Sequence, residues 1–305
     1  MKQLLRPRTV AEGSAESASR RTATVPPVTE PATWGLRRSL LDLTDKLHLA
    51  KPAVRLYELA LAAKAEVAAG GRTHAADGLP VPPARLRAQI GPLHADAAFF
   101  LQSGERQAGL VRELLRQDGS AIDELEAILD WGCGCGRILR HWSGLQRTRV
   151  FGCDIDPRMV EWCAKHLRFA DVTVNELTPP LPYDGSSFEL VYAFSVFTHL
   201  SEELQHAWMR ECSRVLRPGG YLLMSTLGEY YVARKRLTKS ERESFSNGSV
   251  VVLYEQAPGT SLCSAYHPPD YVHGTLAAGF DLVSFRPAAD DGRHDIHLLR
   301  KPAAA

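Results

Sequence analysis

The sequence predicts an α/β fold, built on a mostly parallel sheet and preceded by a helical extension. From about residue 97 onward, short apolar runs alternate with segments in which apolar residues recur at helical spacing. The first apolar run leads directly into a glycine-rich turn, and an acidic residue ends the second run. Strands that alternate with helices form parallel sheets with right-handed crossovers, and ligands bind beyond the carboxyl ends of such strands.

The N-terminal third divides into a tail and a helical extension. Residues 1–33 are rich in small, polar and charged residues without any period, which predicts a disordered tail. Residues 34–96 are expected to form a helical extension that ends in a proline-rich, irregular connection. Leucines recur at helical spacing between 36 and 47, and a second helical pattern runs from Val54 to Gly70. These helices could pack on the core domain or pair two copies of the chain in a homodimer.

Residues 97–305 are expected to form the core domain. Strands are predicted at 127–131, 149–153, 172–174, 188–193, 221–226, 280–286 and 294–300. Helices are predicted near 137–144, 157–167, 201–216 and 269–278. Residues 227–268 interrupt this alternation and carry several aromatic residues, which suit the mouth of a pocket. We therefore expect this insertion on the side of the pocket where a second substrate enters.

The composition argues against several functional classes. A net charge of +1 gives no strong field for nucleic acid, and no apolar run reaches the ~20 residues that span a bilayer. The N-terminus has no apolar signal core. None of the six cysteines forms a C-x-x-C motif, and no paired histidines complete a zinc site. We expect a cytoplasmic protein with reduced cysteines, no bound metal, no membrane span and no nucleic-acid partner.

The glycine-rich turn is the most informative part of the sequence. Residues 128–137 read Ile-Leu-Asp-Trp-Gly-Cys-Gly-Cys-Gly-Arg, so an apolar strand enters a turn with glycine at every second position. Gly132, Gly134 and Gly136 permit positive φ and let backbone N–H groups approach a ligand, with Cys133 packed beside it. A helix that starts at Arg137 would point its N-terminus toward the same ligand.

The spacing around the turn distinguishes between two kinds of ligand. A dinucleotide turn reads G-x-G-x-x-G, whereas Arg137 stands here where the third glycine should be. Asp130, two residues before Gly132, would repel phosphate but could accept hydrogen bonds from an ammonium group. Asp154 follows Gly136 by eighteen residues and suits the two hydroxyls of a ribose. These residues favour a ligand with an ammonium group and a ribose but no phosphate.

Two further motifs extend this pattern. Residues 181–191 read LPYDGSSFELV and residues 214–221 read RVLRPGGY. Together with the glycine turn and Asp154, they resemble the motifs of class I S-adenosylmethionine-dependent methyltransferases over roughly residues 97–300. One departure is Glu189, where the family usually has Asp. The resemblance implies a Rossmann-like, seven-stranded, mostly parallel sheet with an antiparallel last strand, and S-adenosylmethionine as cofactor.

The resemblance also implies roles for individual residues. Asp130 and the turn (Gly132, Cys133, Gly134 and Gly136) would hold the amino-acid end of the cofactor, and Asp154 would bind its ribose. Ile155 would pack on the adenine, and Asn175 or Glu176 would lie near the adenine amino group. Phe194, at the end of the fourth strand, would face the methyl group. His199 and His267 are candidate bases, and His199 could equally be a capping or packing residue before the next helix.

The function that these residues predict is methyl transfer to a small-molecule or glycan-like acceptor by in-line displacement. The Asn/Asp-Pro-Pro-aromatic run of enzymes that methylate nucleobase amines is absent after the fourth strand. A non-catalytic protein that binds S-adenosylmethionine remains an alternative. An NAD(P)-dependent oxidoreductase is a second one, although Arg137 and Asp130 argue against it.

Overall fold

The computed structural model describes residues 60, 63, 74–235, 237–290 and 292–303. The predicted disordered tail lies outside this part of the chain. Almost all residues of the two predicted N-terminal helices also lie outside it. The homodimer expected through these helices therefore stays a prediction. Within the described part, no helix has the length and apolar character needed to cross a membrane.

A seven-stranded sheet organises the molecule, with the strand order β3-β2-β1-β4-β5-β9-β8. Its strands are β1 (Ala127–Trp131), β2 (Arg149–Asp154), β3 (Ala170–Val174), β4 (Phe188–Ala193), β5 (Leu216–Thr226), β8 (Asp281–Asp290) and β9 (His294–Arg300). The first five strands pair in parallel, and β9 runs antiparallel to both of its neighbours. The predicted Rossmann-like sheet with an antiparallel last strand is therefore confirmed.

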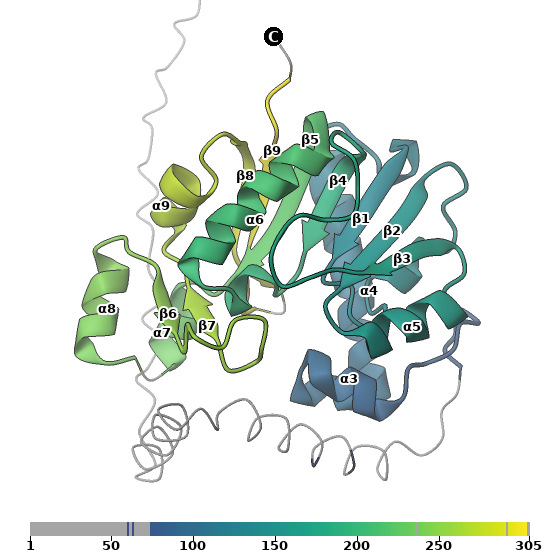
Figure 1. Ribbon diagram of the computed structural model, residues 1–305, viewed down its shortest axis with the longest axis horizontal. Helices are drawn as coiled ribbons and strands as arrows, with labels where there is room; N and C mark the ends of the chain where they lie inside the picture. Colours follow the sequence, from purple (N-terminus) through teal and green to yellow (C-terminus); the bar gives the residue numbers. More distant parts are fainter. Residues whose placement is uncertain (1–59, 61–62, 64–73, 236, 291, 304–305) are drawn as a thin grey trace, which may run out of the picture.

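Apolar side chains cover both faces of this sheet. Successive residues of a strand point to opposite faces. Ile128 of β1 joins one core with α4 (Ala97–Gln117) and α5 (Pro157–His166), whereas Leu129 joins another with α6 (Glu202–Val215). Figure 1 shows α6 in front of the sheet and α4 behind it. Strands buried on both faces are apolar throughout, which is why short apolar runs located them in the sequence.

The helix predicted at 137–144 is wrong. The chain forms a turn there, followed by the short 3₁₀ helix η3 (Leu139–Trp142). Contacts with distant residues hold this segment in place. Trp142 Nε1 donates a hydrogen bond to the Tyr192 hydroxyl at 2.7 Å, and the Arg140 guanidinium binds residues 77–80. Residues 137–144 therefore present no α-helix N-terminus to a ligand.

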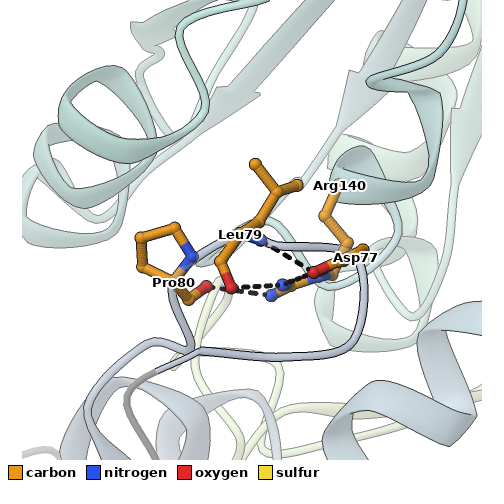
Figure 2. Close-up of polar contacts among 4 residues, drawn as sticks. All are labelled: Asp77, Leu79, Pro80 and Arg140. Carbon is orange, nitrogen blue, oxygen red and sulfur yellow. Dashed lines mark hydrogen bonds and ion pairs between the residues drawn. The ribbon is translucent and has the colours of Figure 1, made fainter.

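The proline-rich connection is more ordered than the sequence predicts, because it contains α3 (Ala84–Ile90) and the 3₁₀ helix η1 (Pro92–Ala95). Figure 2 shows the ion pair that anchors this segment: Arg140 Nε and Nη2 donate to the two carboxylate oxygens of Asp77 at 2.7 and 2.9 Å. The same guanidinium donates to the carbonyl oxygens of Leu79 and Pro80, both at 3.2 Å. Burial acts to raise the pKa of Asp77, but hydrogen bonds from Arg140 and from the Leu79 backbone outweigh it and lower that pKa. The ionised pair holds α3 close to the glycine turn.

The insertion between β5 and the last helix folds on itself to one side of the sheet (Figure 1). It contains α7 (Glu229–Arg234), α8 (Lys239–Ser246) and a two-stranded sheet of β6 (Val251–Leu253) and β7 (Ser264–Tyr266). Phe245 and Tyr266 are buried in its own small core. The last helix, predicted at 269–278, consists of α9 (Pro269–Tyr271) and a π-helical turn, η5 (Val272–Leu276).

Candidate functional site

A cavity of about 710 Å³ lies at the carboxyl ends of β1, β2, β3 and β4. This is where parallel sheets bind ligands, and the volume lies within the roughly 300–1,000 Å³ of small-molecule sites. Nine of the predicted site residues line it: Asp130, Gly132, Cys133, Asp154, Ile155, Asn175, Glu176, Phe194 and His199. Gly134, Gly136 and His267 do not belong to its lining.

The glycine turn bonds to its own neighbours. Gly132, Gly134 and Gly136 have φ values of +80°, +55° and +81°, as predicted for glycine. However, the N–H groups of Gly132 and Cys133 donate to the Cys153 carbonyl at 2.8 and 3.0 Å, and that of Gly136 donates to the Cys133 carbonyl at 3.0 Å. The expectation that these N–H groups face a ligand is therefore wrong. What the glycines provide is space, since a Cβ on Gly132 would lie 2.4 Å from Val196 Cγ2.

Asp130 is a buried carboxylate with unused hydrogen-bonding capacity. It lies on β1 and is 3% exposed, and its Oδ2 has no hydrogen-bond partner. Burial raises the pKa of Asp130 to about 7, although the Tyr192 hydroxyl and the charge of Arg137 oppose the rise. An unpartnered buried carboxylate is costly to the fold, so its presence in a cavity marks a ligand-binding group.

Asp154 ends β2 and is held in place by two backbone N–H groups. Gly134 N donates to its Oδ2 at 2.8 Å, and Asp156 N donates to its Oδ1 at 2.9 Å. Burial raises the pKa of Asp154, and these two hydrogen bonds oppose the rise. Each carboxylate oxygen can accept a further bond. Two oriented acceptors side by side suit the adjacent hydroxyls of a ribose.

Next to Asp154, the lining combines an apolar surface with one unpartnered acceptor. Asn175 follows β3, and its Nδ2 donates to the Glu176 carbonyl at 2.7 Å while its buried Oδ1 has no partner. Ile155 is 43% exposed, although it follows a core strand, and it lines the cavity together with Leu177. A flat, apolar ring with an amino group would fit these residues. Of the two alternatives for the amino group, Asn175 has the unpartnered side-chain oxygen.

His199 lines the same cavity at the end of η4 (Phe197–His199). Its Nδ1 lies 2.7 Å from the carbonyl oxygen of Cys263. Burial lowers the pKa of His199, and this hydrogen bond opposes the change. A neutral imidazole whose Nδ1 faces a carbonyl carries its proton on Nδ1, so Nε2 retains the lone pair.

His267 lies outside the cavity. It is fully buried, its Nε2 lies 2.9 Å from Gln205 Oε1, and burial lowers its pKa to about 3. These surroundings give it a packing role between β7 and α6, and the site does not include it as a base.

The sequence did not predict several parts of the lining, and three of them add a new element or charge to the site. The α3 segment contributes residues 88–92, the buried side chain of Arg137 adds a cation, and the loop between β6 and β7 supplies residues 259–261. The helical spacing of Leu86 and Ile90 could have indicated α3, but the prolines before it suggested an irregular segment. The loop carries no sequence signal, because it reaches the cavity through the fold of the insertion.

Part of the chain is similar to known methyltransferases. Residues 129–224 match the family described as "Methyltransferase domain". A malonyl-[acyl-carrier protein] O-methyltransferase from Hahella chejuensis is 34% identical over 136 residues, which are 44% of this chain and 47% of that protein. A tRNA N(3)-methylcytidine methyltransferase from Drosophila melanogaster is 28% identical over 127 residues, 38% of this chain and 39% of that protein.

A ubiquinone biosynthesis O-methyltransferase from Cereibacter sphaeroides is 30% identical over 103 residues, 33% of this chain and 40% of that protein. The chain thus spans less than half the length of each of these three relatives. Among solved structures, the 1,6-didemethyltoxoflavin-N1-methyltransferase of Burkholderia thailandensis aligns at 16% identity with a TM-score of 0.47, over 65% of this chain and 78% of that chain.

Proposed function

We propose that this chain, whose residues 129–224 match the methyltransferase domain, is a class I S-adenosylmethionine-dependent methyltransferase that methylates a small-molecule or glycan-like acceptor by in-line displacement. The observation that carries the proposal is the gathering of Asp130, Asp154, Asn175 and His199 around one cavity. Each of the first three offers a side-chain oxygen for one part of the cofactor.

The residues of the cavity fit S-adenosylmethionine. The unpartnered Oδ2 of Asp130 would accept a hydrogen bond from the ammonium group of the methionyl tail. Asp154 would accept bonds from the ribose hydroxyls, and Asn175 Oδ1 would accept one from the adenine amino group. Ile155 and Leu177 would pack on the adenine ring.

The cofactor supplies an activated methyl group on a sulfonium, so the protein has to orient the two reactants and exclude water. His199 is the residue that we assign to proton transfer. Its Nε2 would accept a proton from an acceptor hydroxyl or amine, since Nδ1 is engaged with the Cys263 carbonyl. The lowered pKa of His199 keeps the imidazole neutral and ready to act near pH 7.

A small acceptor is supported by the cavity volume of about 710 Å³ and by the weak net charge of +1. Relatives that act on acyl-carrier-bound malonyl groups, tRNA and ubiquinone precursors do not by themselves identify the acceptor.

All six cysteines are free and buried, which supports a reducing compartment such as the cytoplasm.

Calorimetry followed by product analysis tests the proposal. We expect S-adenosylhomocysteine to bind and NADH not to bind. With methyl-labelled S-adenosylmethionine and fractions of small metabolites, we expect mass spectrometry to find one methylated product. Binding of NADH in place of the adenosyl ligand would support the oxidoreductase alternative. Cofactor binding without any labelled product, from metabolites, glycans or tRNA, would support the non-catalytic alternative.

A further inference from the structure

Arg137 places a buried cation in the wall of the cavity. Its side chain lines the cavity and is 7% exposed, and its Nε is buried without a hydrogen-bond partner. Leaving a guanidinium N–H unsatisfied away from water is costly, and truly buried arginines are usually paired on every side. The Nε–H group of Arg137 is therefore a buried donor without a partner among the described residues.

Two distant elements hold this side chain in place. Arg137 Nη1 donates a hydrogen bond to Gln107 Oε1 on α4, and Gln107 Nε2 donates to Asp290 Oδ2 at 2.5 Å, at the end of β8. The backbone of Arg137 lies against Gly104 of the same helix, where a Cβ would come within 2.1 Å of the Arg137 carbonyl oxygen. The orientation of the guanidinium is thus set by the fold, before any ligand binds.

The cavity wall therefore has one acceptor on an acidic residue and one donor on a basic residue that lack a hydrogen-bond partner. Asp130 Oδ2 and Arg137 Nε both lack partners, and both residues line the same space. The two groups are close enough for the positive charge of Arg137 to oppose the rise in the pKa of Asp130. An amino-acid zwitterion matches such a pair, because its ammonium requires an acceptor and its carboxylate requires a donor.

We propose that Arg137 binds the carboxylate of the methionyl tail whose ammonium is held by Asp130, and that Gln107 and Asp290 are positioning residues for Arg137. This inference rests on the proposed function, since it assigns a contact within the same cofactor. Arg137 stands where a dinucleotide turn has its third glycine. Its contact with the carboxylate would distinguish this cofactor from its decarboxylated form.

Three adenosyl ligands separate the two ends of the tail. S-adenosylhomocysteine carries both the ammonium and the carboxylate, S-adenosyl-3-thiopropylamine carries the ammonium alone, and 5′-methylthioadenosine carries neither. Their affinities are measured by calorimetry for the wild-type protein and for the variants Arg137→Met, Arg137→Lys, Gln107→Leu and Asp130→Asn. Arg116→Met, which removes an exposed arginine of α4, is the matched control.

We expect Arg137→Met to weaken S-adenosylhomocysteine binding by at least about tenfold, the loss typical of one charge-assisted contact, and to leave the other two ligands within about threefold. Gln107→Leu should weaken the binding of S-adenosylhomocysteine more than that of the other two ligands. A general loss of stability would not produce such a selective change. Asp130→Asn should weaken both amine-bearing ligands but not 5′-methylthioadenosine. Should Arg137→Met not fold, the selective loss is measured on Arg137→Lys, which retains the charge but not the planar fork.

Equal losses for S-adenosylhomocysteine and its decarboxylated analogue in folded Arg137 variants would overturn this assignment while leaving the methyltransferase proposal intact. So would affinities that match those of Arg116→Met. A wild-type protein that binds none of the three ligands would instead contradict the proposed function itself.

Discussion

His199 and Cys263 are joined by a hydrogen bond of 2.7 Å between the imidazole Nδ1 and the backbone carbonyl oxygen. A second bond runs from the backbone N–H of Gly259 to the carbonyl of His199 at 2.8 Å. The loop between β6 and β7 therefore braces the histidine on two sides and closes the cavity over Ile155 and Leu177. The insertion thus contributes residues 259–261 to the site, whereas its aromatic residues Phe245 and Tyr266 are buried in a core of their own.

The assignment of His199 as a base predicts a selective kinetic effect. With the acceptor identified by the product screen, His199→Gln should lower kcat by about 10²–10⁴-fold, the usual contribution of general acid–base catalysis. Its affinity for S-adenosylhomocysteine should stay within about threefold. A base must be unprotonated, and burial lowers the pKa of His199. Wild-type activity should therefore fall only at a pH below the ordinary histidine range, and an identical pH–rate profile in the variant would exclude the role.

Replacing Asp154 with Ala should weaken S-adenosylmethionine binding at least about tenfold, because it removes contacts worth roughly 1.5–3 kcal/mol. The substitution also removes the acceptor of the Gly134 N–H group. Asp171→Ala, at an exposed position of β3, removes the same charge outside the cavity and serves as the control. Isothermal titration calorimetry measures the affinity of both variants for S-adenosylmethionine. Equal affinities would show that the assignment of Asp154 to the ribose is wrong.

The pKa of Asp130 predicts how binding depends on pH. Because burial raises this pKa to about 7, part of the free protein carries a proton on Asp130 near neutrality. An ammonium-bearing ligand binds the ionised form, so affinity should fall as the pH decreases below about 7, by at most about tenfold per unit. The ligand amine stays charged in that range. In the Asp130→Asn variant, most of this pH dependence of the affinity should be lost. The difference between the pH profiles of the wild type and the variant separates the contribution of Asp130 from that of Asp154. A flat wild-type profile would contradict the assignment.

Two glycines of α4 provide a matched pair. A Cβ at Gly104 would lie 2.1 Å from the Arg137 carbonyl oxygen, whereas a Cβ at Gly109 would meet nothing within 4 Å. Gly109→Ala should stabilise the protein by up to about 1 kcal/mol, since alanine favours helix over glycine. Gly104→Ala should destabilise it and weaken cofactor binding, because α4 or Arg137 must move. Chemical denaturation of both variants measures the difference, and equal effects would exclude this close approach.

The ion pair of Asp77 and Arg140 predicts a stability effect far from the chemistry. Asp77→Ala leaves a buried guanidinium without its carboxylate and should cost about 2–4 kcal/mol. The pKa of Asp77 is lowered in the folded protein, so the stabilisation is present above its ordinary value of 3.8 and is lost as the pH falls through the lowered one. Denaturation curves at neutral and acidic pH test this, and a variant as stable as the wild type would refute it.

The sequence located the sheet because its signals are local. The predicted bounds of β1, β4 and β9 match the structure. β1 and β4 are short, largely apolar runs between turn residues, and β9 has its apolar residues at Ile296, Leu298 and Leu299. Asp130 and Asp154 were chosen by their spacing from the glycine turn, and the structure places both at the ends of adjacent parallel strands, where they line one cavity.

The parts that the sequence did not predict depend on contacts between distant segments. The segment after the glycine turn forms a 3₁₀ helix and no α-helix, because Trp142 bonds to Tyr192, fifty residues away, and Arg140 binds Asp77. Arg137 is held through Gln107 to Asp290, and the loop at Gly259 meets His199 only in the folded protein. No local pattern records such pairs, so a single sequence gives no indication of them.

A crystal structure with sinefungin tests the central claim most directly. We expect the α-amino group of its amino-acid tail to lie about 3 Å from Asp130 Oδ2. We expect its ribose hydroxyls to lie within hydrogen-bond distance of Asp154. An empty cavity after soaking with sinefungin, together with NADH bound in the same place, would contradict the account.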